Sequence, residues 1–179
     1  MPSIETDRLL LRMIRADDLD HLAALFSDPE VVKYVGDGKP AARDEAARAL
    51  ESIIRHWHGH GFGRWLVFEK QTGDFIGLGG LRSLFDMPEL VYHLTKANWG
   101  KGYATEIARA ALRFGFQECG HARIVAITKP PNTASIHVME KLGMRFEKIA
   151  TYYNIEVAQY TISRDDFTPG EGGFKILPD

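Results

Sequence analysis

The chain has 179 residues, of which 45% are hydrophobic and 26% are charged, a composition that is ordinary for a globular protein. With 22 Lys and Arg residues against 24 Asp and Glu residues, the formal net charge is −2, which argues against broad binding to nucleic acid or to an anionic membrane. The single cysteine excludes an intramolecular disulfide and a multi-cysteine metal site. We expect one domain spanning residues 1–179.

Targeting signals are also missing from the sequence pattern. The first residues lack a basic segment followed by an apolar core, so we expect no signal peptide. No run of about 18 apolar residues predicts a membrane span. Together with the lone cysteine, this favours a cytoplasmic protein without a membrane partner.

Hydrophobic periodicity and turn residues predict the following elements in chain order. They are a strand at 8–13, helices at 17–26 and 41–57, strands at 64–69, 75–81 and 89–94, a helix at 103–116, a strand at 123–127, a helix at 132–143, and strands at 145–149 and 156–162. Helices and strands do not alternate strictly, so we expect an α+β domain around one sheet. The tail at 168–179 contains several glycines and is predicted to be loose.

A glycine turn stands between the predicted strand at 89–94 and the helix at 103–116. It reads Trp99-Gly100-Lys101-Gly102 and continues as Tyr103-Ala104-Thr105. Glycines let the backbone approach a ligand closely, and a helix N-terminus offers free N–H groups and the positive end of its dipole. The stretch therefore predicts an anion site, although neither a dinucleotide fingerprint nor a P-loop is present. The alternative is a strand-to-helix turn that needs glycine only for steric reasons.

Four motifs in the right order resemble one family. Residues 5–12 (ETDRLLLR) look like the start "ETERLxLR", residues 89–94 (ELVYHL) look like the strand "EIGYWL", residues 99–106 match "WGKGYATE", and residues 132–144 match "NxxS…EKLGF". All four belong to the GNAT superfamily of acyl-CoA-dependent N-acetyltransferases, in its ribosomal-protein N-terminal acetyltransferase-like branch. The resemblance covers about residues 5–162 and implies a single mixed, largely antiparallel sheet with flanking helices.

The resemblance also implies which residues bind acetyl-CoA, the cosubstrate. The strand residues Tyr92, His93 and Leu94 are expected to hold the pantetheine arm through their main chain. Backbone N–H groups of the glycine turn are expected to bind the pyrophosphate, with Lys101 nearby. The expected cofactor-binding set is Tyr92, His93, Leu94, Trp99, Gly100, Lys101, Gly102, Tyr103, Ala104, Thr105, Asn132 and Ser135.

Two residues are candidates for the proton transfers of the reaction. Glu89 begins the cofactor strand and is the first candidate for the base that deprotonates the amine; the alternative is a solvated charge at a strand end. Many family members protonate the leaving thiolate with a tyrosine, but the matching position here is Met139. In this branch the serine of NxxS is proposed for that task, which implicates Ser135; the alternative is a serine that only bonds its own helix cap. An amide at or near Leu94 is expected to polarise the thioester.

Three functions remain open at this stage. The leading one is transfer of acetyl from acetyl-CoA to an amine such as a protein N-terminal amine, by direct attack in a ternary complex. The alternatives are the same reaction on a small amine (an amino acid, polyamine or antibiotic) and a non-catalytic acyl-CoA sensor. The residues expected to form the acceptor pocket lie at 32–42, 56–63 and 84–88. The family also includes many homodimers.

The spacing of His56, His58 and His60 raises the question of a metal site. Glycines at 59 and 61 interrupt the helix pattern there, and no carboxylate completes a ligand set. We therefore expect no metal, and we place these histidines near the acceptor cleft or on the surface.

Overall fold

Strand pairing joins nine strands into one sheet in the computed structural model, which describes residues 2–178. Their order is β7-β8-β6-β5-β4-β3-β2-β1-β9, and all neighbours are antiparallel except β5 and β6. The strands are β1 (Ser3–Thr6), β2 (Leu9–Met13), β3 (Arg64–Glu69), β4 (Phe75–Leu84), β5 (Met87–Leu94), β6 (Arg123–Thr128), β7 (Arg145–Tyr152), β8 (Ile155–Ser163) and β9 (Phe174–Leu177). The α+β prediction of one mixed, largely antiparallel sheet is confirmed.

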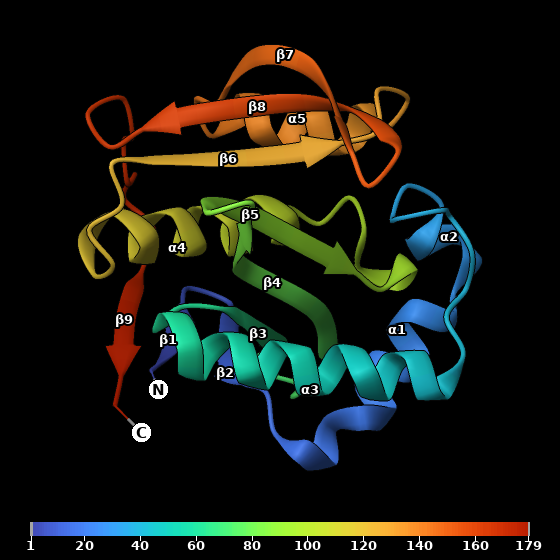
Figure 1. The fold of residues 1–179 in the computed structure, drawn as a ribbon. Coiled ribbons are helices and arrows are strands. Elements are labelled where there is room, and N and C mark those ends of the chain that lie inside the picture. The colour runs from blue at the N-terminus through green and yellow to red at the C-terminus, as the bar shows by residue number, and fades with distance from the viewer. Residues whose placement is uncertain (1, 179) are drawn as a thin grey trace.

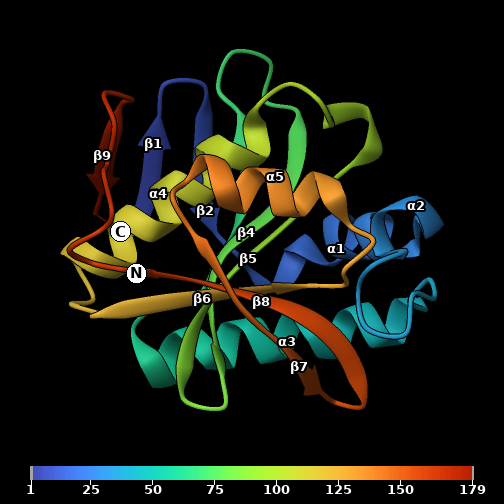
Figure 2. The same cartoon turned by 90° about the horizontal axis from the view of Figure 1, so that it is seen from above.

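Helices cover both faces of this sheet (Figures 1 and 2). They are α1 (Leu19–Ser27), α2 (Pro29–Val32), α3 (Arg43–His60), α4 (Tyr103–Gln117) and α5 (Thr133–Lys141), with short 3₁₀ turns η1 (Ala16–Asp18) and η2 (Lys96–Asn98). Seen from above, α3 lies on one side of the sheet, and α4 and α5 lie on the other (Figure 2). Within residues 2–178, no helix combines the length and the apolar character needed to cross a membrane.

The helix α3 ends later than its glycines predict. The sequence placed its end near Trp57, but the helix continues through Gly59 to His60. It stops at Gly61, which adopts φ +71° and donates its N–H to the Trp57 carbonyl, because glycine enters this left-handed conformation without steric cost. Buried side chains on one helix face, from Ala46 to Trp57, hold it against the core.

Two short strands at one end of the sheet order are absent from the predicted elements. The strand β1 precedes the predicted first strand, and β9 lies in the tail that was predicted to be loose. They pair with each other in antiparallel register from Ser3↔Leu177 to Thr6↔Phe174. The prediction of a loose tail is therefore wrong for residues 174–177. Each strand has only 4 residues, too few for a periodic pattern to be recognised.

The acidic residue before α1 does not cap that helix with its side chain. Asp18 precedes α1, but its carboxylate makes no capping bond to that helix. It instead pairs with the Arg12 guanidinium, with nitrogen–oxygen distances of 2.8 and 2.9 Å, and accepts the Arg15 N–H at 2.7 Å. Because Asp18 is 5% exposed, this buried charge depends on that pairing, which ties the first helical segment to β2.

Close packing of α4 on the sheet depends on a glycine in β4. A Cβ built on Gly79 would lie 2.2 Å from Cγ2 of Ile107, a residue of α4 that is fully buried. Any side chain at residue 79 would push the helix away from the strand. Since α4 begins at the glycine turn, this contact sets where the turn lies relative to the sheet.

Gly79→Ala is expected to lower the free energy of unfolding by about 1–3 kcal/mol, because the new methyl group overpacks the helix–sheet contact. The cost is expected to shrink in an Ile107→Ala background, which removes the clashing group. Denaturant unfolding of the four proteins of this cycle measures both effects. Gly59→Ala is the matched control, since its Cβ meets nothing within 4 Å; equal costs for the two glycine variants would contradict this packing argument.

Candidate active site

The two parallel strands β5 and β6 are paired at one position only, Glu89↔Val125. Beyond that pair they diverge, as Figure 1 shows. The Thr95 N–H donates to the Ile76 carbonyl at 3.0 Å on the β4 side. By the alternation of an antiparallel ladder, the backbone groups of His93 also face β4, whereas those of Tyr92 and Leu94 face the opening. The edge of β5 thus offers free main-chain groups to a ligand.

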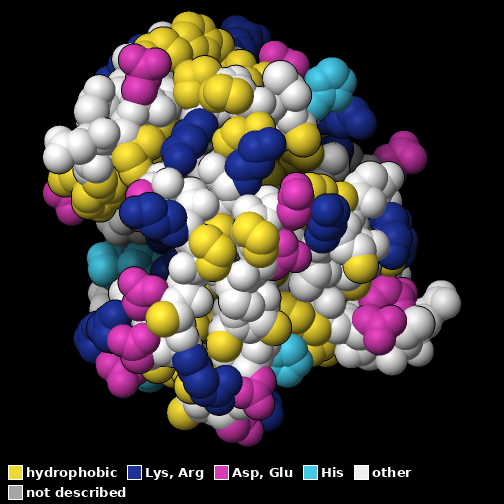
Figure 3. Space-filling view, turned by 90° about the vertical axis from the view of Figure 1, so that its right-hand side faces the viewer, with side chains coloured by type: hydrophobic (Ala, Val, Ile, Leu, Met, Phe, Trp, Pro, Cys, Tyr) yellow, Lys and Arg dark blue, Asp and Glu magenta, His cyan; other side chains and the backbone are white. Residues whose placement is uncertain are grey.

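A cavity of about 770 Å³ occupies this opening. It is lined from both faces of the sheet, because Tyr92 and Glu89 are an odd number of residues apart on β5 and point to opposite faces. Figure 3 shows the right-hand side of the molecule, where α2 and the end of β5 lie; Lys and Arg side chains there stand among hydrophobic ones. The cavity therefore connects the face under α4 and α5 with the face under α1.

Most of the predicted cofactor residues line this cavity. They are Tyr92, His93, Leu94, Trp99, Gly100, Gly102, Tyr103, Ala104, Thr105, Asn132 and Ser135. Lys101 is the exception: it does not line the cavity, and its Nζ donates to Oδ1 of Asn98 at 3.1 Å. The predicted base, Glu89, also lines the cavity.

The glycine turn has the backbone geometry of an anion site. Gly100 and Gly102 adopt φ angles of +74° and +80°, and Gly102 is the N-cap of α4. The Trp99 indole N–H donates to the Leu94 carbonyl at 2.9 Å, which holds the turn against the end of β5. The unpaired N–H groups of the first helical turn are then available to a phosphate at the cavity wall.

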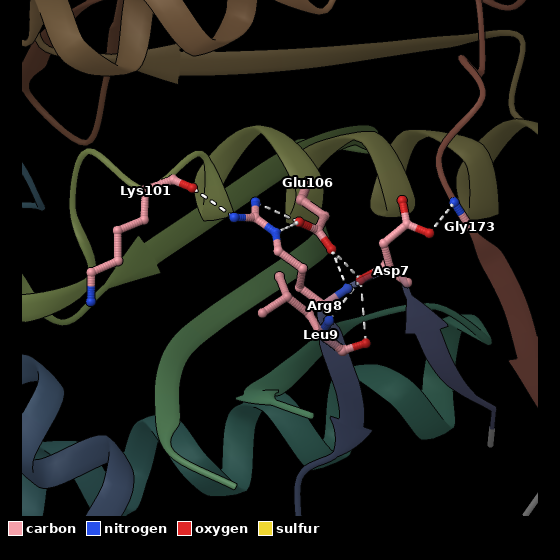
Figure 4. A network of polar contacts seen from close by, with 7 residues as sticks. Asp7, Arg8, Leu9, Lys101, Glu106 and Gly173 are labelled. Carbon is pink, nitrogen blue, oxygen red and sulfur yellow. Dashed lines mark hydrogen bonds and ion pairs between the residues drawn. The ribbon is translucent and has the colours of Figure 1, made fainter. Parts of the chain in front are cut away.

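An ion pair that the sequence analysis missed fixes this turn from behind (Figure 4). Arg8 binds the Glu106 carboxylate through Nε at 2.7 Å and donates from Nη1 to the Lys101 carbonyl at 2.9 Å. Glu106 also accepts the Arg8 N–H and the Thr6 hydroxyl. Arg8 belongs to the motif at residues 5–12, and Glu106 belongs to the motif at residues 99–106. The contact between them could not be predicted from the motifs, because only the fold brings residues 98 positions apart together.

Asn132 and Ser135 lie at the start of α5. Oδ1 of the Asn132 side chain accepts the Ser135 N–H at 3.4 Å, and Nδ2 of the same side chain donates to the Thr128 hydroxyl at 2.9 Å. The Ser135 hydroxyl lies 2.9 Å from the Tyr92 hydroxyl, which also donates to the Ser135 carbonyl at 3.1 Å. Burial raises the pKa of Tyr92 to about 12, so this phenol keeps its proton. No local sequence pattern indicates this Tyr92–Ser135 pair.

Glu89 is buried, with 2% of its surface exposed, and it is not a solvated strand-end charge. Its carboxylate accepts two bonds from Arg82, at 2.6 Å from Nε and 3.1 Å from Nη2. Burial raises the pKa of Glu89, while the Arg82 charge opposes that shift. On the same sheet face, burial and the charges of Arg64 and Arg82 lower the pKa of His93 to about 3, so His93 is neutral.

The acceptor-side wall differs in part from the prediction. Residues 33–36 line the cavity as expected, but no residue from 56–63 or 84–88 does so. Their place is taken by the turn between β7 and β8, through Tyr152 and Tyr153. The exposed Phe85 ring stacks on both tyrosine rings, with centroid distances of 5.7 and 5.4 Å.

The three spaced histidines have other roles in the fold. The Ser83 N–H donates to Nε2 of His56, so Nδ1 carries the hydrogen that faces the Phe62 carbonyl. Both ring nitrogens are therefore occupied, and His60 stacks on this ring at 4.2 Å. Among residues 2–178, no group of three or more His, Cys, Asp or Glu side chains is arranged to hold a metal ion.

The chain is similar to proteins of one family along most of its length. The acetyltransferase (GNAT) domain model matches residues 8–145. An uncharacterized protein of Bacillus subtilis (strain 168), YkkB, is 34% identical over 160 residues, which cover 87% of this chain and 92% of that protein. The [ribosomal protein uS5]-alanine N-acetyltransferase of Escherichia coli (strain K12) is 26% identical over 185 residues, with 93% of each chain covered.

A solved structure shares the fold as well. The GNAT-family acetyltransferase of Bacillus anthracis superposes with a TM-score of 0.79 at 26% identity, covering 91% of this chain and 99% of that one. The predicted resemblance is thus confirmed at the level of the family. The chain belongs to the GNAT family of N-acetyltransferases.

Proposed function

We propose that this N-acetyltransferase moves the acetyl group of acetyl-CoA to a primary amine by direct attack, with both substrates bound at once. The observation that carries the proposal is the cavity between β5 and β6, which reaches both faces of the sheet. A donor on one face and an acceptor on the other can then meet in the opening. Holding them in a fixed orientation supplies much of the rate acceleration.

The residues on the α4 side fit acetyl-CoA. The free edge at Tyr92 and Leu94 suits the amide groups of pantetheine, which pair with a strand edge as an added strand does. The glycine turn and the N-terminus of α4 suit the pyrophosphate. The Leu94 N–H faces the opening and can stabilise negative charge that develops on the thioester oxygen. When bound, the cosubstrate supplies the activated acetyl group.

Glu89 is the proposed base on the acceptor face. A buried carboxylate with a raised pKa accepts a proton more readily than a solvated one. Arg82 holds the carboxylate in one orientation through two hydrogen bonds. Glu89 takes the proton of the attacking amine directly or through one water.

Ser135 is the proposed donor at the departing sulfur, and Tyr92 supports it. The serine hydroxyl can give its proton to the thiolate and regain one from solvent, while the tyrosine hydroxyl, 2.9 Å away, keeps its own proton and positions the serine oxygen. This pair offers the proton that Met139, in the position where many relatives carry a tyrosine, cannot supply. The helix-capping bond from Ser135 N–H to Asn132 uses the backbone and leaves the hydroxyl free for this role.

Two acceptor classes remain within this proposal. The Escherichia coli relative acts on an alanine of a ribosomal protein, which supports a protein N-terminal amine. The FsC-acetyl coenzyme A-N(2)-transacetylase of Aspergillus fumigatus is 30% identical over 164 residues and supports a small amine; the chain covers 68% of that protein. An acyl-CoA sensor without turnover is the third alternative.

Release of free CoA from acetyl-CoA is expected with at least one member of a panel of N-terminal peptides and small amines. A thiol-reactive dye follows the reaction, and mass spectrometry identifies the acetylated amine. Calorimetry with CoA runs in parallel. CoA binding without turnover across the panel would favour the sensor, and absence of CoA binding would contradict the proposed cofactor site.

Ser135→Ala is expected to lower kcat by about 100-fold, the usual size of a general-acid effect, while the Kd for CoA stays within about two-fold. Tyr92→Phe is expected to lower kcat less, and the double variant is expected to resemble Ser135→Ala, because the two hydroxyls act in one path. Thr133→Ala, in the same helical turn but outside the cavity wall, is the matched control. An unchanged kcat in Ser135→Ala would leave that serine only its capping role.

Arg8→Ala is expected to raise the KM for acetyl-CoA about ten-fold, because the carbonyl of Lys101 loses a charged donor and the anion turn becomes mobile. Glu106→Gln keeps the shape and is expected to give a smaller rise. Arg43→Ala, which removes an exposed ion pair to Asp20, serves as the control. Steady-state kinetics together with thermal melts separate the local effect from global unfolding, and equal KM values in all three variants would refute the coupling.

A further inference from the structure

Four polar side chains share the sheet face that looks toward the acceptor side, and we call them the acceptor-face cluster: Arg64, Arg82, Glu89 and His93. Arg82 on β4 stands directly opposite Glu89 on β5. Arg64 on β3 stands opposite Gly80, whose own partner on β5 is Val91, between Glu89 and His93. Arg82, Glu89 and His93 line the cavity wall, and Arg64 lies beside them on the same sheet face, outside that wall.

This cluster contains more positive than negative charge. Glu89 is its one carboxylate, and Arg82 already occupies both carboxylate oxygens. Among residues 2–178, no carboxylate lies within 4.0 Å of the Arg64 guanidinium, and no acceptor forms a hydrogen bond with it. A partly buried excess of positive charge is costly unless an anion compensates it.

The neighbouring His93 does not balance the positive charge of the two arginines. Burial is the main cause of the lowered pKa of His93, and the charges of Arg64 and Arg82 lower it further, so His93 is neutral and adds no charge. The pKa of Arg64 is lowered to about 10, first by burial and then by Arg82, and Glu89 only partly opposes this. Arg64 nevertheless keeps part of its surface exposed.

The cavity also offers no spare carboxylate for a second ammonium group. Its acidic wall residues are Glu30 and Glu89. Glu30 pairs with Lys96 at 3.7 Å, and Glu89 pairs with Arg82 at 2.6 Å. A polycation would therefore find no unpaired carboxylate in the cavity wall, and the nearby arginines would repel it.

We propose that the acceptor is an amino carboxylate, that is, a small amine that carries a carboxylate close to its amino group, and that Arg64 and Arg82 bind this carboxylate. Guanidinium groups recognise carboxylates through paired, charge-assisted hydrogen bonds. The positive surroundings also favour the uncharged form of the amine, which is the form that attacks a thioester. The inference rests on the proposed function, because it names the acceptor of that same site.

The test compares amino acids with their carboxamides, which differ by the anionic charge. Alanine and β-alanine are assayed against alaninamide and β-alaninamide, with spermidine as the polycation, at a fixed saturating concentration of acetyl-CoA. We expect kcat/KM to be about ten-fold or more higher for a carboxylate than for its carboxamide, and lowest for spermidine. The ratio within each pair cancels any general loss of activity.

Arg64→Met keeps the volume of the side chain and removes its charge. It is expected to bring the carboxylate-to-carboxamide ratio close to one, while Arg64→Lys retains part of the preference. Arg48→Met, on the exposed face of α3 where Arg48 pairs with Asp44, is the matched control and is expected to keep the wild-type ratio. A merely structural role of Arg64 would lower activity on both members of a pair and leave the ratio unchanged.

Three results would overturn the inference. Faster turnover of carboxamides, peptides or spermidine than of the carboxylates would do so while leaving the acetyl transfer intact. An unchanged ratio in Arg64→Met would remove that residue from acceptor recognition. If none of the tested amines were acetylated, both the inference and the proposed function would be overturned.

Discussion

The single parallel pair between β5 and β6 is the constraint on which the site depends. A sheet that stayed paired along both strands would satisfy the backbone groups of Tyr92 and Leu94 internally and would leave no opening. Because pairing stops after Glu89↔Val125, the same residues are our proposed ligand-binding groups, and the cavity reaches both faces of the sheet. The helix α4, packed against Gly79, brings the anion turn to that opening. Strand divergence and helix packing therefore produce one site.

The anion turn is held by distant parts of the chain and not by its own glycines alone. Glycine permits the positive φ angles, but it also raises the conformational entropy that the turn loses on folding. The Arg8–Glu106 ion pair and the Trp99 indole bond restrict the turn from two sides. The turn that joins β1 and β2 thus supports the proposed cofactor site. This contact explains why the motif at residues 5–12 occurs together with the motif at residues 99–106.

Much of the fold could be predicted because its elements are long and amphipathic. The hairpin of β3 and β4, the helix α4 and the Asn132 cap of α5 follow from local patterns that need no partner. The strands β1 and β9 could not be predicted, since they have four residues each and are stabilised by each other across the whole chain. The site shows the same division. The cofactor turn is one continuous segment, whereas Arg82 becomes the partner of Glu89 only through the register of β4 and β5. The Tyr92–Ser135 contact joins residues 43 positions apart and has no local signature.

This division has a physical origin in how each substrate is held. In the proposed site the cofactor face binds through backbone groups. It therefore needs a particular chain conformation, which glycines at fixed spacing make possible. The proposed acceptor face consists of side chains from separate strands and from the β7–β8 turn, so many sequences can build it and none leaves a short motif. Side chains there can change without disturbing the anion turn, because they lie on the opposite face of β5. One scaffold can thus keep its donor while its acceptor varies, and the charge of the acceptor face is then the property that separates one acceptor class from another.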